Sequence, residues 1–208
     1  SVFYLPKSSD FLNGLEIFKS IYEIKFLNKR KPLFCEWELT NFCNMSCPFC
    51  STMSPDRNST PDVSPQIALN MIDQLGEMGT KMIHFSGGEP TLRKDLPDLI
   101  AKAKQHNMMV SFTTNGSASI EKMKKLLDTD IIRVSIDGTE HFHDSGRMFF
   151  GAFQKAVETL RFLVSKGKKP IITTVFMDGT PYEMLEDLAL LARDLKSKIS
   201  VNVLSNSH

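Results

Sequence analysis

Short β-rich runs alternate with amphipathic stretches along most of this 208-residue chain. The predicted strands are 33–40, 81–86, 108–113, 131–136, 170–176 and 199–204. The stretches between them carry apolar residues at helical spacing, as Phe153, Val157 and Leu160 do. Strands that alternate with helices form parallel sheets, because each connection returns across the sheet as a helix. We therefore expect an α/β fold, either an open doubly wound sheet or a curved partial barrel.

Capping residues define the predicted helix boundaries. Ser64 is a suitable N-cap and Pro65 suits the first helical position, so one helix begins there and ends at Gly79. The other helices are predicted at Leu96–His106, Ser119–Leu127, Gly151–Lys166 and Pro181–Leu195. The strand runs are nearly continuously apolar, which is expected where both faces of a sheet are covered.

Residues 1–32 lie outside this alternation and are predicted to form an N-terminal helical extension to a domain at 33–208. Ser9 and Asp10 could cap a helix that runs to about Leu27, with basic residues following it. We expect this helix to pack on the sheet domain. The alternative is a basic amphipathic helix at a membrane surface.

Composition excludes several classes of function. The chain is 41% hydrophobic and 24% charged, which suits one large globular domain. Its net charge of +1 gives no electrostatic footprint for nucleic acid, so no nucleic-acid partner is expected. No run is long and apolar enough to span a membrane, no signal peptide is visible, and membrane association is not expected. Cysteine usage fits the reducing cytoplasm.

Three of the four cysteines, Cys43, Cys47 and Cys50, fall in one loop with the spacing C-x3-C-x2-C. A cubane iron–sulfur cluster takes four thiolates, so this loop would leave one iron with a vacant position. A zinc site would need a fourth ligand, and a disulfide would leave one of the three cysteines unpaired. A redox pair of Cys47 and Cys50 would give Cys43 no role.

Cys35 is not expected to be the fourth ligand. It lies near the start of the first predicted strand, whereas the cysteine loop follows the end of that strand. Five residues of extended chain span about 17 Å, so Cys35 lies far from the loop. We interpret it as a small buried residue of the core.

Polar and glycine-rich clusters follow four of the predicted strands, and the carboxyl ends of parallel strands are where ligands bind. Gly87 and Gly88 would allow backbone to approach a ligand closely, and Glu89 could accept hydrogen bonds from a ligand ammonium group. The alternatives are a tight turn and a carboxylate at a helix N-terminus. The four clusters are Cys43–Cys50, Gly87–Pro90, Thr114–Gly116 and Asp137–Gly138.

Further polar residues extend this predicted site. Ser135 and Asp137 could bind a ribose or another polar ligand, and the guanidinium of Arg147 suits a ligand carboxylate. The alternatives are turn capping and a surface ion pair of Arg147 with Asp144 or another acid. His141 and His143 are interpreted as solvated loop residues.

Taken in order, these motifs resemble the radical S-adenosylmethionine (SAM) superfamily. The matching motifs are Cys43-x3-Cys47-x2-Cys50 with Phe49 before the last cysteine, Gly87-Gly88-Glu89-Pro90, Thr114-Asn115-Gly116 and Ser135-Ile136-Asp137-Gly138. The stretch from Ser135 to Arg147, followed by Gly151-x-Phe153, is similar to the branch of SPASM, anaerobic sulfatase-maturing and cofactor-maturing enzymes.

This resemblance implies a partial (βα)6 TIM-type barrel with a [4Fe–4S] cluster on the three cysteines and SAM on the open iron. It also implies reductive cleavage of SAM to a 5′-deoxyadenosyl radical, with electrons from a reductant such as flavodoxin or ferredoxin. That radical would abstract hydrogen from an unidentified substrate, such as a peptide, a cofactor precursor or a lipid-like molecule. The alternative is a non-catalytic iron–sulfur electron carrier or cluster scaffold. The implied cofactor-binding residues are Phe49, Gly87, Gly88, Glu89, Asn115, Ser135, Asp137 and Arg147.

The chain departs from the family pattern in one respect. Many members of this branch carry a cysteine-rich C-terminal extension, whereas no cysteine follows Cys50 here. We therefore expect the domain at 33–208 to lack a C-terminal region, and to need further polypeptide for efficient turnover of substrate.

Overall fold

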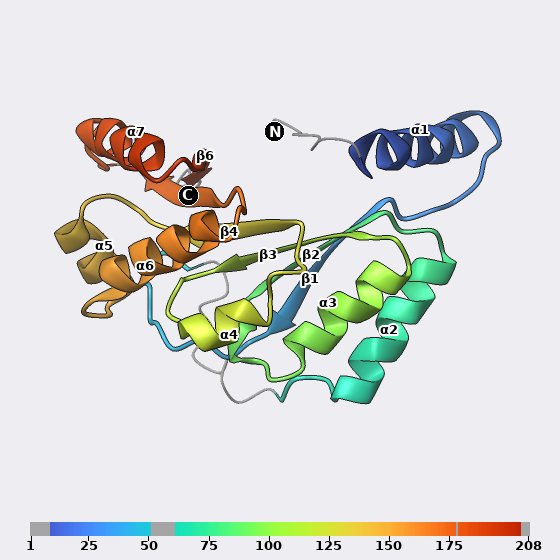
Figure 1. Ribbon diagram of the computed structural model, residues 1–208, viewed down its shortest axis with the longest axis horizontal. Helices are drawn as coiled ribbons and strands as arrows, with labels where there is room; N and C mark the ends of the chain where they lie inside the picture. Colours follow the sequence, from blue (N-terminus) through green and yellow to red (C-terminus); the bar gives the residue numbers. More distant parts are fainter. Residues whose placement is uncertain (1–8, 51–60, 178, 205–208) are drawn as a thin grey trace.

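The computed structural model describes residues 9–50, 61–177 and 179–204, and its sheet contains six parallel strands (Figure 1). The strands lie side by side in the order in which they occur in the chain, without reversal. A doubly wound sheet has a point at which the strand order reverses, so this order identifies a partial barrel. The strands are β1 Phe34–Thr40, β2 Met82–Gly87, β3 Met109–Thr114, β4 Ile131–Ser135, β5 Ile171–Met177 and β6 Lys198–Leu204.

Helices connect successive strands, and α2, α3 and α4 lie together on one side of the sheet (Figure 1). Ser64 caps α2 as predicted, because its hydroxyl accepts a hydrogen bond from the amide of Ile67. A short helix, α5, and a 3₁₀ turn, η1, were not predicted from the sequence. The bounds are α1 Ser9–Phe26, α2 Pro65–Glu77, η1 Pro90–Leu92, α3 Leu96–Gln105, α4 Ile120–Lys124, α5 Glu140–Arg147, α6 Ala152–Ser165 and α7 Glu183–Asp194.

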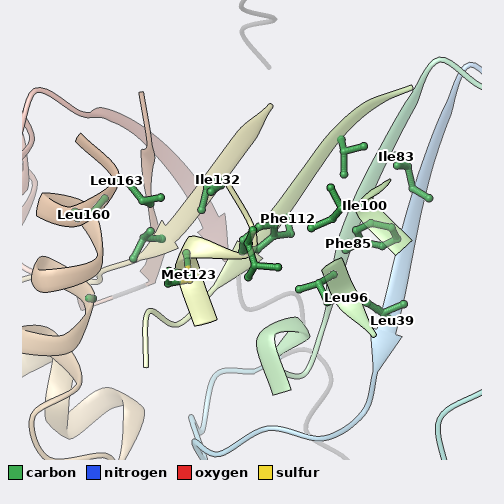
Figure 2. Packing of buried hydrophobic residues seen from close by; sticks show 14 of the residues in the cluster. Leu39, Ile83, Phe85, Leu96, Ile100, Phe112, Met123, Ile132, Leu160 and Leu163 are labelled. Carbon is green, nitrogen blue, oxygen red and sulfur yellow. The ribbon is translucent and has the colours of Figure 1, made fainter. Parts of the chain in front are cut away.

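The hydrophobic core lies between the sheet and the helices. Phe85 and Phe112 are neighbours in the β2–β3 register and are completely buried, with Ile100 of α3 packed in the same cluster (Figure 2). Alternate residues of the strands face the other way, and several of them are polar, including His84 and Ser111. The expectation that both sheet faces are apolar is therefore wrong, because only the face toward the helices forms the core.

Helix α1 forms where the sequence predicts it, but its apolar side chains are not packed on the sheet domain as expected. Phe18 is 76% exposed and Phe26 is 65% exposed. On the polar side of α1, Glu16 pairs with Lys81 at 3.3 Å and Glu23 pairs with Lys31. The division of the chain at residue 32 stays a prediction.

Candidate functional site

The cysteine loop begins where β1 ends, at the carboxyl edge of the sheet. Cys43, Cys47 and Cys50 pack in one small cluster with Met45 and Phe49, separate from the main core. The amide of Cys50 donates to the carbonyl of Cys47 at 3.2 Å, which closes a tight turn. The amide of Met45 lies 3.4 Å from the Cys43 sulfur and donates to it. The loop thus brings the three cysteines together, and its own backbone donates a hydrogen bond to the Cys43 sulfur.

Cys35 has a different environment. It is partly buried against the main core on β1, as the sequence predicts. Across the described ranges, no group of three or more His, Cys, Asp or Glu side chains converges closely enough to hold a single metal ion. A cluster requires less convergence, because each cysteine binds a different iron atom.

Burial raises the pKa of the Cys47 thiol, and the neighbouring Cys43 and Cys50 raise it further. The positive charge of Arg147 opposes these effects. Cys43, Cys50 and this guanidinium therefore all lie close to the Cys47 sulfur. Such an environment disfavours a bare thiolate and favours a thiolate whose charge is neutralised by bound iron.

Gly87 and Gly88 bring the end of β2 against the cysteine loop. The amide of Gly88 donates to the carbonyl of Thr40 at 2.6 Å, and the amide of Glu89 donates to that of Phe42 at 2.7 Å. A Cβ atom on Gly88 would lie 2.1 Å from the Phe42 carbonyl oxygen, and Gly87 has φ +110°. The close approach that these glycines allow is therefore to the backbone that positions the cysteines.

The Glu89 carboxylate is buried and fully engaged by the protein. One oxygen accepts hydrogen bonds from the amide and hydroxyl of Thr91 and from the hydroxyl of Thr114, and the other accepts from the amide of Asn115. Burial raises the pKa of Glu89, and these hydrogen bonds oppose that rise. From the sequence, Glu89 was expected to accept hydrogen bonds from a ligand ammonium group. In the structure its oxygens accept hydrogen bonds from the protein, and they join the end of β2 to the end of β3.

Asn115 connects the end of β3 to the cysteine loop. Its side-chain nitrogen, Nδ2, donates to the Asn44 side-chain oxygen at 2.9 Å and lies 4.0 Å from the Cys43 sulfur. Its side-chain oxygen accepts from the amide of Ser117. Both Asn115 and Glu89 therefore hold the loops around the cysteines in place.

Asp137 and Arg147 form a buried ion pair, which the sequence did not predict. The Arg147 Nε and Nη2 atoms each lie 2.8 Å from Asp137 Oδ2, and Asp137 Oδ1 accepts from the amide of Val175. The Arg147 guanidinium also lies over the Phe49 ring, 5.9 Å from its centroid. Ser135 lies at the end of β4 and is 8% exposed.

Helix α5 carries Arg147 into the site, and its assignment as a loop was wrong. His143 was expected to be solvated, yet its side chain is completely buried and its Nδ1 accepts from the amide of Asp137 at 3.1 Å. Burial lowers the pKa of His143 to about 4. His141 is exposed, as expected. Instead of pairing with Arg147, Asp144 accepts hydrogen bonds from the amides of Gly151, the N-cap of α6, and Phe153 in its first turn.

The signal for α5 was present but weak. Thr139 is a suitable N-cap residue, Glu140 lies in the first turn and Arg147 in the last, as the helix dipole favours. Helix propensity is low for the glycine and the aspartate in between, which concealed the helix.

The family model of the radical SAM superfamily matches residues 37–195, which include the end of β1, the cysteine loop, strands β2 to β5 and helix α7. The chain belongs to the radical SAM superfamily. Its relatives are cofactor-maturing and peptide-modifying enzymes of the SPASM branch, as the sequence motifs indicate.

Two curated relatives illustrate the match. The chain is 35% identical over 149 residues to Fe-coproporphyrin III synthase of Methanosarcina barkeri, covering 70% of this chain and 37% of that protein. It is 31% identical over 164 residues to the mycofactocin maturase MftC of Mycolicibacterium smegmatis, covering 77% of this chain and 42% of that one. The chain therefore spans less than half the length of these relatives.

The fold is also found in a solved structure. Streptococcus suis SuiB bound to its precursor peptide SuiA superimposes with a TM-score of 0.75 at 17% identity, covering 95% of this chain and 45% of SuiB. This likeness confirms the partial-barrel fold. Among the described helices, none is both long and apolar enough to cross a lipid bilayer.

Proposed function

We propose that this chain is the catalytic barrel of a radical SAM enzyme, in which Cys43, Cys47 and Cys50 hold a [4Fe–4S] cluster. The observation that supports this most strongly is the packing of the three cysteines at the carboxyl edge of the sheet, with the Gly88 and Asn115 loops bonded to their loop. When bound, the cluster and SAM would supply a 5′-deoxyadenosyl radical that abstracts hydrogen from the substrate.

The chain's own residues would orient these groups and exclude water from them. Gly87, Gly88 and Glu89 fix the loop beside the cysteines, and Asn115 anchors Asn44 within it. Shielding matters because a primary carbon radical reacts with whatever is near it. Phe49, Ser135, Asp137 and Arg147 are proposed to line the SAM site, with Arg147 held in place by Asp137.

The substrate class is proposed from the relatives, whose names include an Fe-coproporphyrin III synthase, a heme synthase and a PqqA peptide cyclase. A cofactor precursor or a peptide is therefore favoured over a lipid-like molecule. A low-potential carrier such as flavodoxin or ferredoxin is the proposed electron donor. All four cysteines lie within the described ranges and none forms a disulfide, which supports a reducing compartment such as the cytoplasm.

The test is anaerobic reconstitution with iron and sulfide, followed by reduction with dithionite in the presence of SAM. The proposal predicts formation of 5′-deoxyadenosine and methionine in equal amounts. A protein that carries the full cluster but forms neither product would be an electron carrier or a scaffold, and the proposal would be wrong.

A further inference from the structure

The sheet face opposite the hydrophobic core carries a band of polar and charged side chains. Glu36 lies beside His84 in the β1–β2 register, and His84 lies beside Ser111 in the β2–β3 register. Thr113 lies beside Arg133 in the β3–β4 register. Because laterally paired residues of parallel strands share a face, these five residues occupy the inner face of the partial barrel.

His84 is held rigidly within this band. Its Nδ1 lies 2.8 Å from the Ser111 hydroxyl and its Nε2 lies 3.1 Å from the Thr113 hydroxyl. The Ser111 hydroxyl donates to the carbonyl of Ile83, so it is left to accept a hydrogen bond from Nδ1–H. Burial lowers the pKa of His84 and the charge of Arg133 lowers it further, whereas Glu36 raises it. His84 is thus a neutral, fixed neighbour of Arg133.

Arg133 has no counter-ion within the part of the chain that the structure describes. Arg133 is partly buried, yet its guanidinium donates no hydrogen bond and forms no ion pair there. The two other arginines near the sheet edge are both paired, Arg93 with Asp95 at 2.6 Å and Arg147 with Asp137. A cation partly removed from water without a partner is costly, and an anionic ligand would relieve that cost.

We propose that Arg133 binds a carboxylate of the substrate, so that the substrate is an acidic molecule anchored on the inner face of the barrel. This inference rests on the proposed function and deepens it. Arg133 precedes Ser135 by two residues, which places it about 7 Å below the end of β4, beneath the rim where the cofactor would bind. A guanidinium fork matches a carboxylate in geometry as well as in charge.

The position of Glu36 determines in which direction the substrate carboxylate would point. It is exposed at the β1 side of the same band, two strands away from Thr113 and three from Arg133. Its negative charge repels an anion on that side, so the substrate carboxylate is directed toward β4. The second acidic residue of this face, Glu38, lies beside Ser86 and acts in the same sense.

The experiment uses glutarate as the carboxylate probe and glutaramide as its neutral counterpart, added anaerobically to the cluster-loaded, oxidised protein. Binding is followed by NMR on the ring carbons of His84, next to the proposed site. Glutarate is expected to bind and to raise the pKa of His84 by screening Arg133, whereas glutaramide is not. Arg133→Gln should weaken glutarate binding about tenfold or more, and Arg133→Lys should retain part of it.

Arg161→Gln is the matched control, because it removes the same charge from an exposed arginine on α6. This variant should bind glutarate as the wild-type protein does. Failure of the wild-type protein to bind glutarate, or equal binding by Arg133→Gln and wild type, would overturn the proposal.

SAM also carries a carboxylate, so the titration is repeated with saturating SAM. Unchanged glutarate affinity is expected, and displacement of glutarate by SAM would assign Arg133 to the cofactor and overturn the substrate assignment. Formation of 5′-deoxyadenosine by the same wild-type preparation tests the proposed function separately. Product without glutarate binding defeats only the acidic-substrate inference, whereas glutarate binding without product defeats the enzymatic assignment and leaves Arg133 as a carboxylate site that no longer serves a substrate.

Discussion

Arg147 of α5 and Asp137 beyond β4 form an ion pair in which both Nε and Nη2 of the arginine lie 2.8 Å from one carboxylate oxygen. Both residues are nearly inaccessible to solvent. The pair attaches a helix that the sequence did not reveal to the edge of the sheet that carries the candidate site. It also means that a guanidinium expected to meet a ligand carboxylate already has an acidic partner.

Breaking this pair from one side should be strongly destabilising. Arg147→Met leaves the Asp137 charge buried without a partner, which typically costs about 3–5 kcal/mol in the free energy of unfolding. Urea denaturation measures this loss, and the double variant Asp137→Asn/Arg147→Met should recover part of it. The exposed pair of Arg193 and Asp194 gives the control, since Arg193→Met should cost less than about 0.5 kcal/mol. Equal effects of the two methionine substitutions would contradict the buried-pair account.

Glu89 should matter chiefly as a carboxylate that accepts four hydrogen bonds. Glu89→Gln replaces one acceptor oxygen by a donor amide, so at least one buried donor loses its partner, at a cost of about 1–3 kcal/mol. Glu121→Gln is the control, because the Glu121 side chain is 80% exposed. Thermal or urea unfolding compares the two. A Glu89→Gln protein as stable as the control would indicate that the carboxylate is free for a ligand instead.

Gly88 should not tolerate a side chain. The Cβ of Gly88→Ala would lie 2.1 Å from the Phe42 carbonyl oxygen, so the loop that carries the cysteines has to move. We expect this variant to lose most of its reconstituted iron while keeping its far-UV circular dichroism spectrum. In Gly14→Ala the added Cβ meets nothing within 4 Å, so this helical control should load iron normally. Normal iron loading of Gly88→Ala would show that the loop is not held as described.

The stability of the protein should depend on pH through His143. The pKa of His143 is lowered to about 4 in the folded state from an ordinary value of 6.5, so the folded state binds fewer protons than the unfolded state between these values. Stability is therefore greatest above pH 6.5 and falls as the pH drops toward 4, by on the order of 3 kcal/mol. His143→Gln should remove this component from the pH profile of unfolding. Parallel profiles for the two proteins would contradict it.

The groups that face His143 act in both directions. Burial is the largest effect and lowers the pKa of His143, and the charge of Arg147 lowers it further. Asp137 and Asp144 raise the pKa. Because those groups are present in both proteins, the difference between the wild-type and His143→Gln profiles isolates the contribution of the imidazole.

The sequence predicted the elements with strong local signals. Ser64 and Pro65 identify the start of α2, and the six apolar runs match the six strands within one or two residues. The position of the cysteine loop at the carboxyl edge followed from the strand that precedes it. These features depend on local spacing and propensity, which a single sequence shows directly.

Partners distant in the sequence could not be predicted. Glu89 meets the amide of Asn115, 26 residues away, and this contact depends on the relative position of two strand ends. The acid paired with Arg147 was equally open, since a ligand carboxylate, Asp144 and Asp137 offer the same chemistry. The exposed apolar face of α1 was missed because an amphipathic pattern predicts a buried face but not whether a surface covers it.

The iron content of four cysteine variants tests the central claim most directly. After anaerobic reconstitution, the wild-type protein should bind about four irons per chain, as one cubane cluster does. Cys43→Ala, Cys47→Ala and Cys50→Ala should each lose the cluster, whereas Cys35→Ala should retain it, because Cys35 packs in the main core. Equal loss of iron in Cys35→Ala, or full iron loading in any of the other three variants, would contradict the three-cysteine site.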